Sequence, residues 1–167
     1  MSVPEYQYQT IEYKPNYFLH IFLFIITFFT VTIAGVQWVL KDPFELTNLH
    51  FGLPYSFSIL FIIASHEFGH YFAARKHNVV TTLPYFIPFP PFPFILNFGT
   101  LGAVIRIKSF VPNRKALFDI GVAGPIAGFI ATLLVLIYGF ENLPDIEYLY
   151  QIHPEYRFLP QLPEGDL

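Results

Sequence analysis

The chain has 167 residues, of which 54% are hydrophobic and 20% aromatic, whereas only 13% are charged. This composition carries more apolar surface than a small soluble core can bury, so we expect a membrane protein. A formal net charge of -3 offers no basic stripe for nucleic acid, and the absence of cysteine excludes disulfides, thiolate metal sites and a thiol nucleophile. Any metal ion must be held by histidine and carboxylate side chains.

The first half of the chain contains two apolar segments after a polar start. Residues 1–16 are polar and predict an N-terminal tail. Residues 17–40 then carry no formal charge, which is long enough for a helix to cross about 30 Å of hydrocarbon. Residues 53–74 predict a second span, but its second half contains two histidines and a glutamate. Ionisable groups are costly in lipid, so their presence there indicates a function.

A proline-rich segment follows the second span. Five prolines between residues 84 and 93 prevent residues 79–98 from forming an ordinary helix and predict an irregular, Phe-rich loop. Non-helical backbone at membrane depth must pack on protein or line a wet cavity, so we expect this loop to fold against a site. Residues 99–108 alternate in polarity and predict a strand of a short β-hairpin. That strand either offers its edge to an extended substrate or pairs only within its own hairpin.

A third span is predicted at residues 116–140, which include the small residues Gly121, Ala123, Gly124 and Gly128. Small residues allow helices to approach closely in lipid. Residues 141–167 predict a polar C-terminal tail, which leaves residues 17–140 as the membrane-embedded core. The predicted fold is therefore an α-helical, multi-pass integral membrane protein with about three transmembrane helices and a membrane-associated loop and hairpin between the second and third.

The basic residues predict the orientation of these spans. If the N-terminus is cytoplasmic, seven of the nine Lys and Arg residues lie inside and two, Lys41 and Arg157, lie outside. The positive-inside rule favours that arrangement. It places the N-terminus and the polar half of the second span on the cytoplasmic side.

The polar half of the second span carries the motif HExxH, in which His66, Glu67 and His70 are the fixed residues. Residues four apart share one face of a helix, so both histidines can bind one metal ion while the glutamate reaches a water beside it. Zn²⁺ suits such a site because it activates water and polarises a carbonyl without redox chemistry. Alternatively, the three side chains satisfy one another at a helix interface without metal.

The motifs together resemble one known family. The HEFGH segment at residues 66–70, the segment GTLGAVIR at 99–106 and the segment FDIGVAGPIAG at 118–128 follow one another as they do in the site-2 protease family of intramembrane zinc metalloproteases. The resemblance implies that His66 and His70 are zinc ligands and that Glu67 is the general base. It also implies substrates that are transmembrane segments of other proteins.

The sequence departs from that family in one respect. Members supply a third zinc ligand from an aspartate in a Leu-Asp-Gly context on a later helix, and this sequence contains neither feature. A catalytic zinc normally has three protein ligands, so we expect the chain to be the N-terminal part of a longer protein. Asp119 is a candidate substitute ligand. Alternatively, it is an aspartate of the first helical turn, held by the helix dipole or by Arg114.

Three functions are consistent with this pattern. The first is a zinc endopeptidase that hydrolyses transmembrane segments of other membrane proteins, surrounded by membrane lipid, with Glu67 as the proton acceptor. The second is an inactive relative that binds helices through its small-residue third span and its Phe-rich loop. A metal transporter is the third, although it would need ligands on several spans. The sequence leaves the substrate, the trigger and the oligomeric state open.

Overall fold

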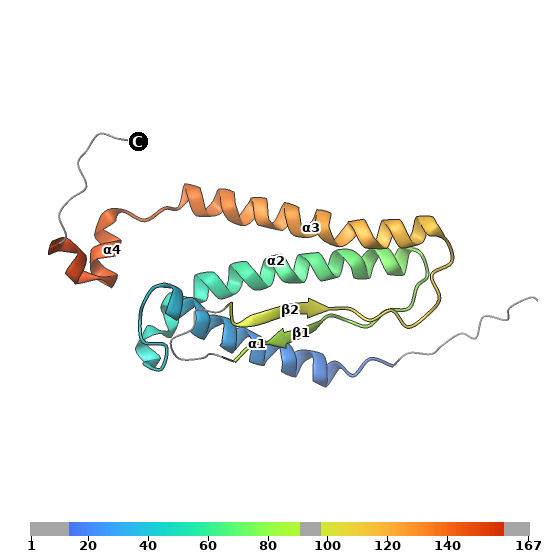
Figure 1. Cartoon of the computed structure of the whole chain (residues 1–167), viewed down its shortest axis with the longest axis horizontal. Helices are drawn as coiled ribbons and strands as arrows, with labels where there is room; N and C mark the ends of the chain where they lie inside the picture. Colours follow the sequence, from blue (N-terminus) through green and yellow to red (C-terminus); the bar gives the residue numbers. More distant parts are fainter. Residues whose placement is uncertain (1–13, 91–97, 159–167) are drawn as a thin grey trace, which may run out of the picture. The chain divides into compact units, whose positions relative to one another are not determined.

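The computed structural model describes residues 14–90 and 98–158. The protein is mostly helical, with a two-stranded sheet that follows the second long helix in the chain and lies beside the first two long helices (Figure 1). Its elements are, in chain order, α1 (Tyr17–Trp38), the 3-10 helix η1 (Leu46–Asn48), α2 (Leu49–Lys76), β1 (Tyr85–Pro88), β2 (Thr100–Val104), α3 (Arg114–Glu141), α4 (Ile146–Ile152) and the 3-10 helix η2 (Pro154–Phe158).

The three predicted spans coincide with α1, α2 and α3. Each of these helices is long and apolar enough to cross a membrane, with η1 counted as part of the second. The prediction was less accurate at the ends: α2 begins four residues before position 53 and continues through Arg75 and Lys76. Charged residues end an apolar span without ending a helix, because Arg and Lys are good helix formers. The structure therefore confirms a mostly helical fold with three helices of membrane-spanning length.

Helices α1 and α2 touch along their backbones. A Cβ atom on Gly52 of α2 would lie 2.0 Å from the carbonyl oxygen of Thr32 in α1, and one on Gly35 would lie 2.8 Å from the carbonyl oxygen of Gly52. Beside this contact the Thr32 hydroxyl donates to the Ser56 hydroxyl at 3.0 Å, and both side chains are buried. Close backbone approach and an interhelical hydrogen bond are the usual means of holding helices together in lipid.

The sheet is an antiparallel hairpin in which Tyr85 pairs with Val104 and Phe86 with Ala103. Its apolar side packs on the helices, because Phe86 and Ala103 form one buried cluster with Val31 of α1 and Leu60 of α2. The hairpin and the first two helices thus share one apolar core. This arrangement brings β2 beside the polar half of α2, where the HExxH motif lies.

The hairpin differs in detail from the sequence prediction. The predicted strand at 99–108 is regular only over β2, and a single bridge joins Thr81 to Ile107 further along. Residues 79–98 were expected to be irregular, yet β1 lies within them. Pro84 and Pro88 are separated by three residues without proline, Tyr85, Phe86 and Ile87, and this short stretch suffices for pairing. The register shifts between Phe86 and Pro88.

A second compact unit begins at residue 134, and the structure describes it as far as residue 158. Within it α4 is seven residues long, too short to cross a membrane. The Arg157 guanidinium pairs with the Glu147 carboxylate, and His153 Nδ1 lies 2.9 Å from Glu155 Oε1. Residues 1–13, 91–97 and 159–167, which include most of the predicted N-terminal tail, part of the Pro/Phe-rich loop and the end of the C-terminal tail, lie outside the described residues.

Candidate metal centre

The two histidines of the HExxH motif point their ring nitrogens at each other. His66 Nε2 and His70 Nε2 are 3.1 Å apart, and the two rings meet at an interplanar angle of 74°. Two nitrogen ligands at about 2.05 Å from one tetrahedral zinc ion lie about 3.3 Å apart. The separation and the donor type therefore fit two ligands of a single Zn²⁺ ion.

The ring of His70 is oriented by the third helix. Its Nδ1 atom lies 2.6 Å from the carbonyl oxygen of Ile120 in α3. A carbonyl can only accept a hydrogen bond, so Nδ1 carries the proton and Nε2 keeps its lone pair free for a metal. Metal-bound histidines commonly donate their second nitrogen to a carbonyl in this way.

Two glycines of α3 receive the two imidazole rings. A Cβ atom on Gly124 would lie 2.1 Å from His70 Nε2, and one on Gly128 would lie 3.1 Å from His66 Nδ1. Between them Gly69 of α2 faces Ala123, whose carbonyl oxygen would be 2.5 Å from a Cβ atom at position 69. The four-residue spacing of these glycines equals that of the histidines, so each ring lies against a position without a side chain.

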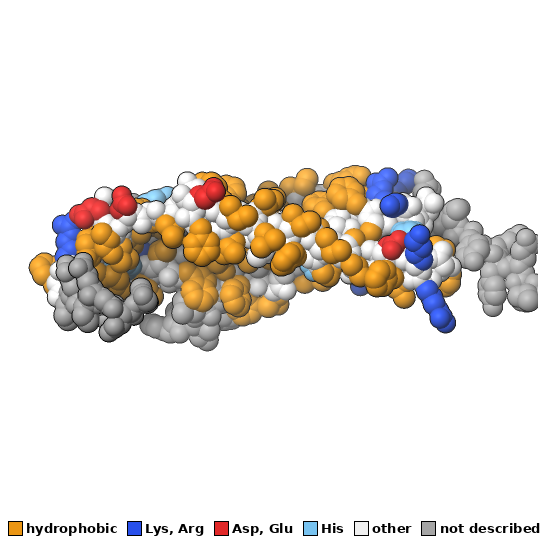
Figure 2. Space-filling view, turned by 90° about the horizontal axis from the view of Figure 1, so that it is seen from above, with side chains coloured by type: hydrophobic (Ala, Val, Ile, Leu, Met, Phe, Trp, Pro, Cys, Tyr) orange, Lys and Arg blue, Asp and Glu red, His pale blue; other side chains and the backbone are white. Residues whose placement is uncertain are grey.

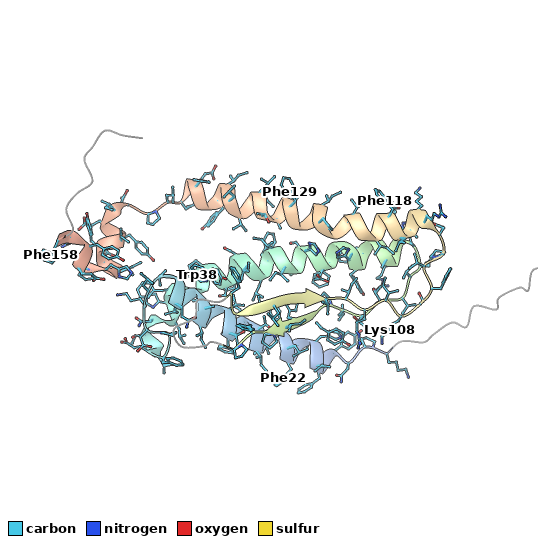
Figure 3. The ribbon with its side chains drawn as sticks, in the orientation of Figure 1. Phe22, Trp38, Lys108, Phe118, Phe129 and Phe158 are labelled. Atoms are coloured by element: carbon cyan, nitrogen blue, oxygen red, sulfur yellow. The ribbon has the colours of Figure 1, made fainter. Side chains whose placement is uncertain are left out.

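The outer face of α3 has the opposite character. The side chains of Phe118 and Phe129 project from α3 away from α2 and are 67% and 63% exposed (Figure 3). Hydrophobic side chains cover much of this face (Figure 2). Within residues 114–133, α3 therefore presents small residues to α2 and large apolar residues outward, as a helix between protein and lipid would.

Glu67 lies on the side of α2 that faces the hairpin. It is only 9% exposed, and the backbone amide of Ile105, directly after β2, lies near its carboxylate. Val104 pairs with Tyr85 of β1, and successive residues of a strand point their amides to opposite sides. The amide of Ile105, the next residue, therefore points away from β1. The end of the hairpin thus contributes a backbone amide to the surroundings of Glu67.

Asp119 has a different partner from those considered in the sequence analysis. His77 Nε2 lies 2.8 Å from Asp119 Oδ2, which ties the end of α2 to α3. Because α3 begins at Arg114, Asp119 falls in its second turn rather than its first. Among residues 14–90 and 98–158, no third His, Asp or Glu joins His66 and His70 in a metal-binding group.

Sequence reasoning predicted His66, Glu67 and His70 as site residues but did not predict the groups that lie against them. The carbonyl of Ile120 and the amide of Ile105 are backbone groups, and no residue type indicates them. Gly124 and Gly128 were recognised only as small residues for helix packing. Their spacing, equal to that of the histidines, is the one signal in the sequence that points to their contact with the rings.

Comparison with known proteins agrees with these motifs. The chain is 42% identical over 78 residues to the protein named probable zinc metalloprotease EGY1, chloroplastic, of Oryza sativa subsp. japonica, a match that covers 46% of this chain and 12% of that protein. It is 32% identical over 135 residues to the protein named probable zinc metalloprotease EGY2, chloroplastic, of Oryza sativa subsp. indica, covering 78% and 24%. The EGY2 protein of Arabidopsis thaliana is 30% identical over 122 residues, covering 72% and 21%.

These relatives are much longer proteins. The chain spans between 12% and 24% of their length in the matches given above. No solved structure matches it. A family model described as Peptidase family M50 matches residues 54–155, which is more than half of the chain and contains all three segments that carry the resemblance. The chain therefore belongs to peptidase family M50, the site-2 protease family.

Proposed function

We propose that this chain carries the catalytic motif of an intramembrane zinc metalloendopeptidase, which hydrolyses peptide bonds in transmembrane segments of other membrane proteins. The observation that carries the proposal is the pair of Nε2 atoms of His66 and His70, which lie 3.1 Å apart. Membership of peptidase family M50 and the names of the zinc metalloprotease relatives support it.

In this proposal His66 and His70 hold the ion through their Nε2 atoms. When bound, Zn²⁺ supplies Lewis acidity, which makes water more acidic and polarises the scissile carbonyl. Glu67 accepts the proton of the attacking water and later passes it to the leaving amine. The carbonyl of Ile120 keeps His70 in the required tautomer, and the amide of Ile105 orients the Glu67 carboxylate.

A catalytic zinc site needs one more protein ligand than the described residues bring together. We propose that residues outside the described ranges supply it, rather than Asp119, whose carboxylate is engaged by His77. The relatives, at least four times as long as the segments they match here, have ample chain for such a ligand.

The location follows from the three long helices. We propose that α1, α2 and α3 cross the membrane, with the N-terminus and the metal-binding half of α2 on the cytoplasmic side. The support for this orientation is the distribution of Lys and Arg, seven of nine of which it places inside. Hydrolysis would then occur within or just below the cytoplasmic leaflet.

The structure weakens the alternative of an inactive helix-binding relative. That alternative depends on the small-residue face of α3 being free for a partner helix. In the structure Ala123, Gly124 and Gly128 are covered by Gly69 and the two histidine rings of α2. That face is used within the chain, which argues against one of the two binding surfaces of the alternative, the other being the Phe-rich loop.

Metal binding is the first test. We expect the detergent-purified chain to bind Zn²⁺, and the His70→Ala variant to bind it at least tenfold more weakly, because one of two nitrogen ligands is lost. His50→Ala is the matched control, since His50 is exposed and its Nδ1 atom contacts only the carbonyl of Thr47. Equal zinc affinity in the wild-type chain and the His70→Ala variant would contradict the proposed site.

Hydrolysis is the second test. A membrane-anchored reporter with a single transmembrane segment, co-expressed with the protein that contains this chain, should be cut within that segment. Glu67→Gln should reduce cleavage at least a hundredfold and leave zinc content unchanged, because the amide accepts no proton. A variant that cleaves as fast as the wild-type protein would exclude Glu67 as the general base.

A further inference from the structure

A pocket lies at the end of α2 that follows the metal centre. Its volume is about 460 Å³, which is within the range of small-molecule sites. It is lined by residues from the start of α1, from the last two turns of α2 and from the chain leading into β1: Pro15, Tyr17, Tyr71, Arg75, Asn78, Val79, Val80, Thr81 and Leu83. None of His66, Glu67 and His70 is among them, so the pocket is separate from the candidate metal centre.

Arg75 gives the pocket its charge. Its Nη1 atom donates to the Tyr71 hydroxyl at 3.0 Å, and its guanidinium carbon lies 5.8 Å from the centre of the Tyr71 ring. These two contacts hold the guanidinium at the pocket while leaving most of its donors available. Among the described residues no carboxylate lies within ion-pair distance of Arg75.

The surroundings of the pocket are basic on the side of the hairpin. The Lys108 amide donates to the carbonyl of the lining residue Val80 at 2.7 Å, and the Thr82 amide donates to the carbonyl of Arg106 at 2.9 Å. Lys108 lies at the end of the hairpin near the start of α1 (Figure 3). Further Lys and Arg side chains gather where α3 begins (Figure 2). The local field therefore favours an anion.

The pocket also lies at the boundary of the apolar spans. Tyr17 is the first residue of α1, and Arg75 is followed only by Lys76 in α2. Phe18 and Phe72, which adjoin the lining residues Tyr17 and Tyr71 in sequence, are 77% and 64% exposed. An occupant would thus meet a cation and hydroxyl groups at the pocket, and the exposed ring of Phe72 lies 5.5 Å from the ring of the lining residue Tyr71, so polar and apolar contacts adjoin there as a phospholipid requires.

We propose that this pocket binds the phosphate headgroup of an anionic membrane lipid, with Arg75 and the Tyr17 hydroxyl as donors to the phosphate. The inference rests on the membrane insertion assumed in the proposed function, but not on its catalytic chemistry. A free phosphate ion offers the same oxygen acceptors. Only a lipid would also use the exposed rings of Phe18 and Phe72.

The test is native mass spectrometry of the detergent-solubilised 167-residue chain with dioleoylphosphatidylglycerol, dioleoylphosphatidylcholine or inorganic phosphate. We expect one phosphatidylglycerol to be retained at least tenfold more tightly than phosphatidylcholine, and Arg75→Gln to remove that preference. Lys76→Gln is the matched control, because it makes the same charge change at the next exposed position without touching the pocket. It should retain the preference.

Three results would overturn the proposal. The first is equal phosphatidylglycerol binding by the wild-type chain and Arg75→Gln, and the second is an equal loss in Arg75→Gln and Lys76→Gln, which indicates general electrostatic attraction. The third is Arg75-dependent binding of inorganic phosphate with no preference among the lipids, which excludes a lipid site. Zinc affinity measured on the same variants distinguishes a failure of the lipid site from a failure of the metal centre, since Arg75→Gln should leave the zinc affinity unchanged.

Discussion

The Nδ1 atom of His70 lies 2.6 Å from the carbonyl oxygen of Ile120, so a backbone group of α3 orients a side chain of α2. The carbonyl belongs to a helix turn that also contains Gly124, against which the same ring lies. Metal affinity should therefore depend on how closely α3 approaches α2, and not only on the residues of the HExxH motif.

Gly124→Ala tests this dependence. The new methyl group would lie 2.1 Å from His70 Nε2, so either the ring or α3 must move. We expect zinc affinity to fall ten- to a hundredfold, as measured by competition with a chromogenic chelator. Gly121→Ala is the control, because a Cβ atom there meets nothing within 4 Å. Wild-type affinity in the Gly124→Ala variant would show that the contact does not position His70.

Gly128→Ala should have a smaller effect than Gly124→Ala. Its Cβ atom would lie 3.1 Å from His66 Nδ1, a contact that a shift of a few tenths of an ångström relieves. We expect a loss of zinc affinity of less than tenfold, measured in the same competition assay. A loss greater than that of Gly124→Ala would contradict the close packing of His70 against Gly124.

Asp119→Asn distinguishes a structural aspartate from a metal ligand. The substitution weakens the contact with His77, whose side chain is 20% exposed while that of Asp119 is 37% exposed. Because solvent screens such a pair, we expect a loss of at most about 1 kcal/mol in the free energy of unfolding and no change in zinc affinity. The stability loss should not add to that of His77→Gln in a double-mutant cycle. A tenfold loss of zinc affinity would restore Asp119 as a ligand.

Ile105→Pro removes the backbone amide that lies near the Glu67 carboxylate. We expect cleavage of the membrane-anchored reporter to be lost while zinc affinity is retained, since the described hydrogen bonds of the His70 ring go to Ile120 and His66. Ile105→Val is the matched control because it keeps the amide and most of the side chain. Cleavage at the wild-type rate by Ile105→Pro would exclude a role for this edge of β2, either in holding Glu67 or in pairing with an extended substrate.

The parts of the structure that depend on local sequence could be predicted. A charge-free run such as 17–40 predicts a membrane-length helix because the hydrocarbon core has a fixed thickness. The relation of His66 to His70 follows equally from the helical repeat, which places residues four apart on one face. Both features need only the neighbouring residues, and both helices appear in the structure.

The contacts between distant segments could not be predicted. Asp119 is 42 residues from His77, and a helix dipole or Arg114 offered a nearer explanation for its charge. Likewise, the alternation at 99–108 indicates a strand but not the partner of Val104, which is fixed by how the hairpin packs on α1. Such pairings depend on the register between elements, which packing of the whole core determines.

If α1 and α2 cross a membrane as proposed, the contact between Gly52 and Thr32 bears on how the protein would respond to its bilayer. Because the two backbones touch there, we expect the pair to tilt together when the hydrocarbon becomes thinner or thicker. His66 lies 14 residues beyond Gly52, or about 21 Å along the helix. At that distance a change in the tilt of α2 would change the depth of His66 in the membrane. Bilayer thickness would then set how far the metal centre lies from water.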